Sequence, residues 1–315
     1  LPLRARPRAC PPPDPAPPGV GGCARAAPVR RPCAAMVAAA EEQAGILEEA
    51  LGFVAEQRFY LRKAAQQGDL EGALRCGLCL ANELRSSKLL PQNYYRLYAL
   101  VFWELQHLAA FVADTERHGL DVEEIYEIVQ YEGSVLPRLY LLVTVGAVQA
   151  GSAGGRDVLD DLSTLLGAVQ HPLRGLFLRY FLLQMVKDKL LPLRGARGAL
   201  TFLLANLREA ASLWARLRLE EVALRGAAEE PAAAGETWRL DRGRHALRLL
   251  VGAHVVHLAR LRPLGVELYS EVVLPEVLRL STGCEDAAGQ AHLLQCFVEA
   301  LPDRFHAATL ERVLA

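Results

Sequence analysis

Aromatic residues, excess charge and long apolar runs are all scarce in this sequence, and each shortage argues against a class of protein. Phe, Trp and Tyr together make up 7% of the 315 residues, and the alternation of polar and apolar positions that is typical of strands is rare. Lys and Arg number 35 against 36 Asp and Glu, which leaves no basic excess to neutralise a phosphate backbone. The composition therefore disfavours a strand-rich fold and a general nucleic-acid-binding protein.

Neither a disulfide framework nor a membrane-spanning segment is indicated. A bilayer requires roughly 20 consecutive apolar residues, whereas the longest apolar stretches are residues 139–148 and 249–256. The cysteines are odd in number and scattered through a chain large enough to fold without disulfides, a pattern typical of the reducing cytosol. They are Cys10, Cys23, Cys33, Cys76, Cys79, Cys284 and Cys296. We expect a cytoplasmic protein that reaches membranes only through partners or a peripheral surface.

The first 35 residues differ from the rest of the chain. They hold ten of the 18 prolines, six arginines and one acidic residue, Asp14. Such a segment cannot bury enough apolar surface to fold, and none of it resembles a secretory signal. Met36 precedes the first helical pattern and is a candidate initiator. We interpret residues 1–35 as a disordered Pro-, Arg- and Ala-rich extension, either translated upstream sequence or a Pro-rich ligand.

After Met36, helical patterns alternate with short breaks. Leu and Ala, both strong helix formers, dominate the 52% of residues that are hydrophobic. Each break carries a glycine, a proline or a capping side chain. These signals are Gly68-Asp69, Leu90-Pro91, Gly119, Asp121 with Glu124, Gly133-Ser134, Asp157, His171-Pro172 and Pro192. Between residues 172 and 187 apolar side chains occupy nearly every side, so this helix must be packed among neighbouring helices.

Helix pairs recur about every forty residues, which is typical of the HEAT class of α-solenoid although no strict sequence period is present. We predict an all-α fold, a HEAT-like α-solenoid of antiparallel helix pairs, and a compact helical bundle is the alternative. The predicted organisation is N-terminal repeats over residues 36–192 and more diverged repeats over residues 193–315. A loop is expected near residues 225–237, which are rich in Ala, Gly and Glu.

An aspartate cluster is a weak candidate for catalysis. Asp157, Asp160 and Asp161 resemble part of the aspartate-rich magnesium motif of helical isoprenoid synthases, but their order is wrong and a second acidic motif is absent. No nucleophile elbow or glycine-rich phosphate loop is present. We therefore predict that the chain is not an enzyme and has no catalytic residue and no cofactor.

Two pairs of potential metal ligands are also weak. Cys76 with Cys79, and His254 with His257, each lack the further ligands that a zinc site needs. Inside apolar helices such residues are more often packed in the core. We predict no metal site.

Two uninterrupted stretches carry a resemblance to a known family. YEIVQYEGSVLPRLYLLVTVG, residues 126–146, and VQHPLRGLFLRYFLLQ, residues 169–184, resemble the vacuolar protein sorting 35 family, the large helical-repeat subunit of the retromer endosomal sorting coat. ELRSSKLLPQNYYRLY, residues 83–98, is similar to the family's spacing of Glu-Leu-Arg, Pro and Tyr-Tyr. The resemblance covers residues 46–192, and a thinner likeness continues in LRLLVGAHVVHLARL and LPDRFHAATL.

The resemblance implies a scaffold whose N-terminal helices bind the arrestin-like Vps26 subunit. The element tied to that binding in the family is PRLYLL, here Pro137, Arg138, Leu139, Tyr140, Leu141 and Leu142. Pro137 presets a helix start, and Arg138 can offer a planar fork to a carboxylate or to carbonyls. The alternative is that Leu139 to Leu142 are core residues, whose mutation would act by deforming the helix.

Further partners follow from the same resemblance. Residues 58–74 are similar to the family's sorting-nexin-contacting helices through Phe59, Arg62, Lys63 and Leu70, although an ordinary amphipathic helix with a solvated basic patch gives the same pattern. A Rab GTPase and cargo tails are also implied. The expected location is therefore the cytoplasm, with peripheral recruitment to endosomal membranes, and the expected role is retrieval of membrane cargo to the Golgi or the cell surface.

The chain also departs from the family pattern. The acidic insert that follows the proline at position 192 is missing, which puts in doubt any contact that the insert makes. The sequence ends at Ala315, so we expect the site for the metallophosphoesterase-like Vps29 subunit to be absent, as in an N-terminal fragment or a shortened relative. Two hypotheses result: a retromer-type adaptor, or a diverged helical-repeat interaction protein that has lost retromer assembly.

Overall fold

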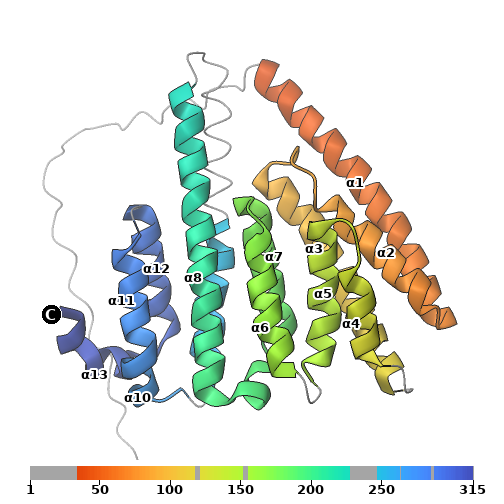
Figure 1. Cartoon of the computed structure of the whole chain (residues 1–315). Helices are drawn as coiled ribbons and strands as arrows, with labels where there is room; N and C mark the ends of the chain where they lie inside the picture. Colours follow the sequence, from red (N-terminus) through yellow and green to blue (C-terminus); the bar gives the residue numbers. More distant parts are fainter. Residues whose placement is uncertain are drawn as a thin grey trace, which may run out of the picture.

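The computed structural model describes residues 34–117, 121–151, 155–227, 247–262, 264–284 and 287–314, and every regular element in these ranges is a helix. The helices stand side by side in a row, from α1 at one end to α11, α12 and α13 at the other (Figure 1). This arrangement confirms the predicted all-α solenoid. Of the extension predicted over residues 1–35, residues 1–33 lie outside the described residues, so their disorder stays a prediction, whereas Ala34 and Ala35 already belong to the first helix.

The helices have the following bounds. The N-terminal elements are α1 (Ala34–Gln67), α2 (Leu70–Glu83), α3 (Pro91–Arg117), α4 (Val122–Gln130), α5 (Val135–Gln149), α6 (Gly155–Leu165), the 3-10 turn η1 (Leu166–Ala168), α7 (Pro172–Val186) and α8 (Leu190–Ala227). A helix over residues 247–260 follows. The last elements are α10 (Val266–Leu268), the π-helical segment η2 (Tyr269–Val273), α11 (Leu274–Thr282), α12 (Ala287–Ala300) and α13 (Asp303–Leu314).

Most helix starts lie where the sequence signals place them. The Asp69 carboxylate accepts the Gly72 amide at 2.9 Å and caps α2, and the Asp121 carboxylate accepts the Glu123 amide at 2.8 Å and caps α4. Both side chains satisfy amides that have no partner inside the helix. The predicted cap at Asp157 is wrong, because α6 already begins at Gly155 and Asp157 lies within its first turn.

The break predicted at Pro192 lies three residues further on. Pro192 is in the first turn of α8, where its missing N–H has no helical partner to lose, so the helix tolerates it. The backbone instead turns at Gly195, which has φ 66° and ψ 179° and lies between two helical stretches. The predicted loop near 225–237 begins later than expected, because α8 continues through Ala227; residues 228–246 lie outside the described residues.

The core of the N-terminal half is centred on α5, which contacts α2, α3, α4, α6 and α7. Aromatic rings join the layers: Phe177 of α7 lies 5.0 Å from Tyr94 and 4.7 Å from Tyr98 of α3, measured between ring centroids. Tyr94 also donates its hydroxyl hydrogen to the Leu84 carbonyl at 2.8 Å. The predicted burial of α7 is confirmed, since its buried residues lie on all sides of the helix. Among the helices that the structure describes, none is both long and apolar enough to cross a membrane.

A buried polar pair joins the helix over residues 247–260 to α7 and α8. The Asn206 amide donates to the Arg179 carbonyl and to His254 Nε2, each at 3.1 Å. His254 Nδ1 lies 2.8 Å from the Leu250 carbonyl, which can only accept, so the proton is on Nδ1 and the ring is neutral. Burial lowers the pKa of His254 to about 4, because a charged ring would be desolvated and its second N–H would face the Asn206 amide.

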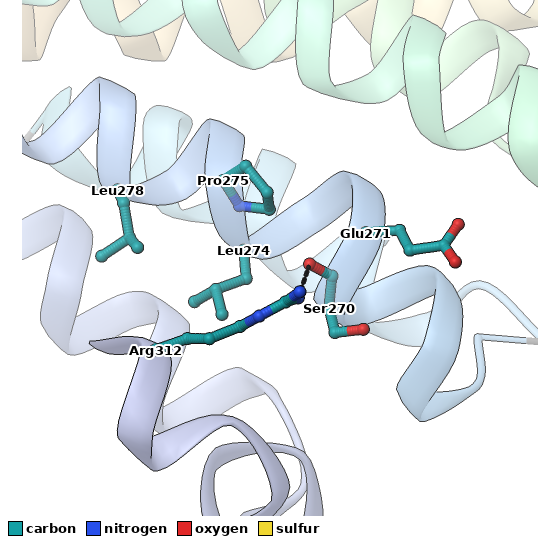
Figure 2. Close-up of a pocket in the computed structure, with 6 residues that line it drawn as sticks. All are labelled: Ser270, Glu271, Leu274, Pro275, Leu278 and Arg312. Atoms are coloured by element: carbon teal, nitrogen blue, oxygen red, sulfur yellow. Dashed lines mark hydrogen bonds between the residues drawn. The ribbon is translucent and has the colours of Figure 1, made fainter. Parts of the chain in front are cut away.

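The π-helical segment η2 has a local cause in the sequence. The Leu274 amide bonds to the Tyr269 carbonyl, five residues back, and the same spacing sets the Ser270 carbonyl opposite Pro275, which has no N–H. Arg312 of α13 donates to this Ser270 carbonyl at 3.2 Å (Figure 2). The side chain thereby supplies the hydrogen bond that Pro275 cannot, and it fixes α13 against η2.

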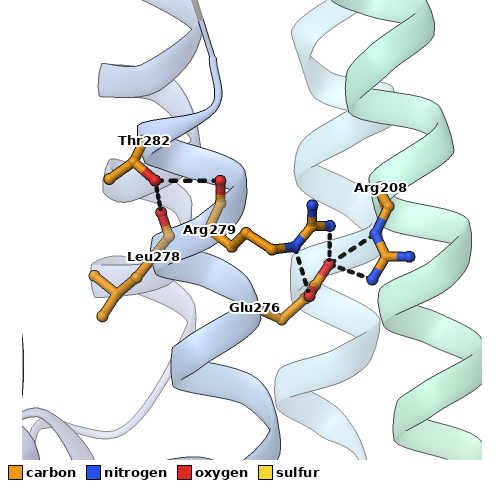
Figure 3. A network of polar contacts seen from close by, with 5 residues as sticks. All are labelled: Arg208, Glu276, Leu278, Arg279 and Thr282. Atoms are coloured by element: carbon orange, nitrogen blue, oxygen red, sulfur yellow. Dashed lines mark hydrogen bonds and ion pairs between the residues drawn. The ribbon is translucent and has the colours of Figure 1, made fainter.

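A charged network at the surface joins α8 to α11. Glu276 of α11 accepts from Arg208 of α8 at 2.6 and 2.8 Å, and from Arg279 at 2.6 and 3.0 Å (Figure 3). The hydrogen bond from Arg279, with that from Arg208, holds the pKa of Glu276 below its usual range. Because both arginines are about half exposed, solvent screening keeps the network's contribution to stability small.

Replacing Gly195 by alanine should lower the free energy of unfolding by about 1 kcal/mol, because a Cβ strains the left-handed backbone. The matched control is Gly52→Ala on the exposed side of α1, where nothing lies within 4 Å of the added Cβ. There alanine should raise the free energy of unfolding by about 0.5–1 kcal/mol, because it is the better helix former. Urea unfolding followed by circular dichroism measures both free energies of unfolding. If the two substitutions change this free energy in the same direction, the left-handed turn at Gly195 is contradicted.

His254 should make the fold sensitive to mild acid. Its folded pKa of about 4 lies below the ordinary 6.5 of the unfolded chain, so the unfolded state binds more protons between these values. Stabilisation that is complete above pH 6.5 is therefore lost as the pH falls toward 4, on the order of 3 kcal/mol in all. The variant His254→Met removes the acceptor of the Asn206 amide, so its free energy of unfolding should be lower at pH 7. Because methionine cannot take up a proton, this free energy should also change less between pH 6.5 and pH 4. An identical pH dependence of the two proteins would show that the buried ring is not held neutral.

Candidate functional site

The PRLYLL motif lies in the first turns of α5, and its apolar residues belong to the core. Its buried members are Pro137, Leu139, Tyr140, Leu141 and Leu142. Tyr140 packs against Phe181 of α7 with ring centroids 5.0 Å apart, so the two stretches that carry the family resemblance contact each other through α5 and α7. Leu139 to Leu142 are thus buried in the core, and how their mutation would act on partner binding stays a prediction. Arg138 is the one residue of the motif that is not buried, and it is partly exposed.

Arg138 holds the turn between α4 and α5. Its Nη1 donates to the Glu132 carbonyl at 3.0 Å and to the Gln130 carbonyl at 3.4 Å. Because α4 ends at Gln130, these oxygens lie at its C-terminus, where carbonyls have no helical partner and the helix dipole favours a cation. The planar fork predicted for Arg138 therefore contacts carbonyls of its own chain.

Three exposed apolar side chains flank this turn, and we call them the α4–α5 patch. Ile128 in the last turn of α4 is 64% exposed, Tyr131 at its end is 89% exposed and Val135 at the start of α5 is 46% exposed. Sequence reasoning missed them. The exposure of Ile128 could have been predicted, because it lies on the polar side of α4 with Glu124 and Glu127, and the helix buries its opposite side.

The residues predicted for sorting-nexin contact lie on α1 and at the start of α2. Phe59 is 64% exposed and Lys63 is exposed, whereas Leu70 is partly buried against the core. Arg62 Nη2 lies 3.3 Å from Glu104 Oε1 of α3. Phe59 and Lys63 are therefore available to a partner, while Arg62 also joins α1 to α3.

Trp103 of α3 is a further exposed aromatic residue that was not predicted from the sequence. It is 60% exposed and precedes the nearly buried Glu104, to which Arg58 and Arg62 of α1 both pair. The predicted set lies on α1 and α2 and the PRLYLL motif lies on α5, so the structure gives two candidate surfaces on different helices.

The weak candidates for chemistry have ordinary structural partners. Asp160 pairs with Arg194 at 2.7 Å, His257 lies 3.1 Å from Gln184, and Cys76 and Cys79 are free thiols. Burial raises the pKa of Cys76, which disfavours the thiolate form that metals bind. Within the described ranges, no group of three or more His, Cys, Asp or Glu side chains could hold a metal ion.

Comparison with known proteins extends the likeness to the C-terminal end of the chain. A model of the family described as vacuolar protein sorting-associated protein 35 matches residues 46–315. Vacuolar protein sorting-associated protein 35B of Arabidopsis thaliana is 37% identical over 290 residues, which are 89% of this chain and 35% of that protein. The relative of Dictyostelium discoideum, vacuolar protein sorting-associated protein 35, is 38% identical over 282 residues, 87% of this chain and 35% of that protein.

A more distant relative gives the same result. Vacuolar protein sorting-associated protein 35 of Schizosaccharomyces pombe is 33% identical over 286 residues, which are 86% of this chain and 32% of that protein. The chain thus spans about a third of the length of the curated relatives that it matches. Since the family model covers residues 46–315, from α1 through α13, the chain belongs to the vacuolar protein sorting-associated protein 35 family.

Proposed function

We propose that this chain is a non-catalytic scaffold of a retromer-type coat, and that it binds the arrestin-like Vps26 subunit through the α4–α5 patch. The coat would retrieve membrane cargo from endosomes to the Golgi or the cell surface. Family membership supports the scaffold role. The observation that supports the binding surface is the exposure of three apolar side chains at a turn that Arg138 holds in place.

The chemistry of the turn fits a protein partner. Ile128, Tyr131 and Val135 offer apolar anchors of the kind that dominate protein interfaces, and tyrosine also keeps a hydroxyl for hydrogen bonding. The buried part of PRLYLL cannot touch a partner without unfolding α5. In this proposal the motif acts indirectly: Pro137, Leu139 and Tyr140 fix α5, Arg138 fixes the turn, and the patch makes the contact.

A second surface of this scaffold would bind a sorting nexin through Phe59, Lys63 and Trp103. Phe59 and Lys63 lie four residues apart on α1, and a cation beside an exposed aromatic ring suits an acidic or polar protein surface. A Rab GTPase and cargo tails complete the proposed set of partners, and membrane recruitment would come through them. The alternative is a diverged helical-repeat protein that keeps the fold without coat assembly, and failure to bind Vps26 would favour it.

Ile128→Asp should weaken Vps26 binding by the full chain at least about tenfold, because it places a charge in the centre of the apolar contact. Val298→Asp on α12 is the matched control, because Val298 is a β-branched helical residue of similar exposure, 60%. Isothermal titration calorimetry measures affinity, and thermal unfolding should show equal melting midpoints for the two variants. Equal affinities of the two variants for Vps26 would contradict the proposal that Vps26 binds through the α4–α5 patch.

Arg138→Trp tests whether the arginine acts through the turn. It should weaken Vps26 binding and also destabilise the protein by about 1–3 kcal/mol, because the Glu132 and Gln130 carbonyls lose a charged donor. Arg138→Lys keeps a cation at the end of α4, so it should retain part of the Vps26 affinity and part of the stability that Arg138→Trp loses. Lost binding with an unchanged melting midpoint would instead indicate that Arg138 contacts Vps26 directly.

Lys63→Glu combined with Phe59→Ala should reduce sorting-nexin-dependent recruitment to liposomes about tenfold, without lowering the melting midpoint, because both side chains are exposed. Arg62→Glu is a poorer test, since it also sets a carboxylate beside the nearly buried Glu104 and should destabilise the α1–α3 contact. Liposome flotation with and without the sorting nexin measures recruitment. Unchanged recruitment of the double variant would remove this surface from the proposal.

A further inference from the structure

A groove of about 760 Å³ lies between α7, the helix over residues 247–260 and α12. It belongs to neither of the two surfaces proposed above, since its lining residues lie between Tyr180 and Ala300. The volume is within the range of sites that hold a peptide segment or a small molecule. Its lining is apolar at the bottom and charged at the edge.

The bottom of the groove is formed by small and apolar side chains. Gly252 and Ala253 contribute from the helix over residues 247–260, and Cys296 and Ala300 contribute from α12; these four residues are buried or partly buried. A Cβ at Gly252 would lie only 3.2 Å from Cys296 Sγ, so a larger residue would narrow the space between these two helices. Gly252 therefore lets α12 approach this helix closely, and Ala253 beside it contributes only a methyl group to the lining of the groove.

An exposed leucine stands beside this apolar surface. Leu249, one turn before Gly252 and Ala253 on the same helix, lines the groove and is 70% exposed. Val256, one turn further on, is also exposed. Spacings of three and four residues put these side chains on one side of the helix, where an apolar segment could lie along them.

The edge of the groove is cationic although the chain as a whole has a net charge of -1. Lys187, Arg248 and Arg260 line it, against the single carboxylate of Glu299. Lys187 donates to the Gln184 Oε1 at 3.2 Å, which turns the Gln184 amide nitrogen toward His257 Nε2 at 3.1 Å. His257 Nε2 must then accept this hydrogen bond, so the His257 ring is neutral. The positive charge of the groove therefore comes from the lysine and the two arginines.

We propose that this groove is a docking site for an acidic peptide segment of a partner protein. An aliphatic side chain of the segment would lie over Gly252 and Ala253, next to Leu249, and its carboxylates would pair with Arg248 and Arg260 at the edge. Charge complementarity selects an acidic occupant, and the apolar bottom selects a peptide over a free anion. Grooves between the repeats of a solenoid commonly bind extended segments in this way.

The test uses a fluorescein-labelled synthetic peptide that alternates glutamate pairs with leucine pairs, added to the full chain and followed by fluorescence polarisation. The same peptide with glutamine in place of glutamate is the control for charge, and one with alanine in place of leucine is the control for the apolar anchor. Binding of the acidic leucine peptide should be tighter than that of either control by about tenfold, and it should weaken as salt is raised.

Matched variants locate the site. Arg248→Glu with Arg260→Glu should reduce binding of the acidic peptide about tenfold or more, whereas the same reversal at the exposed Arg75 and Arg96, outside the groove, should leave it unchanged. Ala253→Phe, which fills the bottom of the groove, should abolish binding with all charges intact. Binding of Vps26 by these variants should not change, which separates this proposal from the function proposed above.

A measurement on the unmodified chain covers the case in which a variant does not fold. The acidic peptide carrying a photoreactive leucine analogue should crosslink to helix 247–260 or α12, as mapped by mass spectrometry. Crosslinks elsewhere, equal binding of all three peptides, or insensitivity to both the reversal and Ala253→Phe would overturn the proposal. So would light scattering that shows a second copy of the chain occupying the groove, as a dimer that Ala253→Phe dissociates.

Discussion

The burial of α5 is the constraint on which the N-terminal half of the structure depends. Every residue from Leu139 to Gln149 is buried, and five other helices contact α5. Full burial of each leucine or valine contributes about 1.5–3 kcal/mol, and the one threonine satisfies its hydroxyl within the helix, since Thr144 donates to the Tyr140 carbonyl at 2.8 Å. A helix enclosed in this way cannot shift without disturbing both its neighbours and the turns at its ends.

This enclosure explains why the most recognisable motif is mostly hidden. Leu139, Tyr140 and Leu142 are buried, and the Tyr140 ring packs against Phe181 of α7, so these side chains serve the packing of the core. We propose that partners bind to side chains that the packed helices leave exposed. At α5 that is the turn which Arg138 joins to the end of α4, and further along the solenoid it is the groove beside the helix over residues 247–260.

Much of the fold could be predicted because its signals are local. Asp69, Asp121, Pro91 and Pro172 each act within one turn of a helix, and each lies at or next to a helix start in the structure. The boundaries predicted at Asp157 and Pro192 are wrong for a common reason, because an aspartate or a proline is as acceptable inside the first turn of a helix as at its boundary. Near Pro192, the chain turns at Gly195 instead.

The candidate surfaces depend on contacts between distant parts of the chain, which no local pattern reveals. Exposure of Tyr131 is set by how α4 meets α5, and the role of Arg62 is set by Glu104, which lies 42 residues away. The groove needs α7, helix 247–260 and α12 together. The sequence therefore pointed to the helices that carry PRLYLL and residues 58–74 as binding surfaces, which stays a prediction, and it did not reveal the exposure of Ile128, Tyr131 and Trp103 or the cationic groove.

The most direct test of the central claim is hydrogen–deuterium exchange of the full chain with and without Vps26. If α5 is a rigid support and the turn is the contact, amides in residues 122–134 should exchange more slowly in the complex. Amides in residues 139–149 should be slow in both states. Protection confined to other helices, or slowed exchange throughout α5 on binding, would contradict the account.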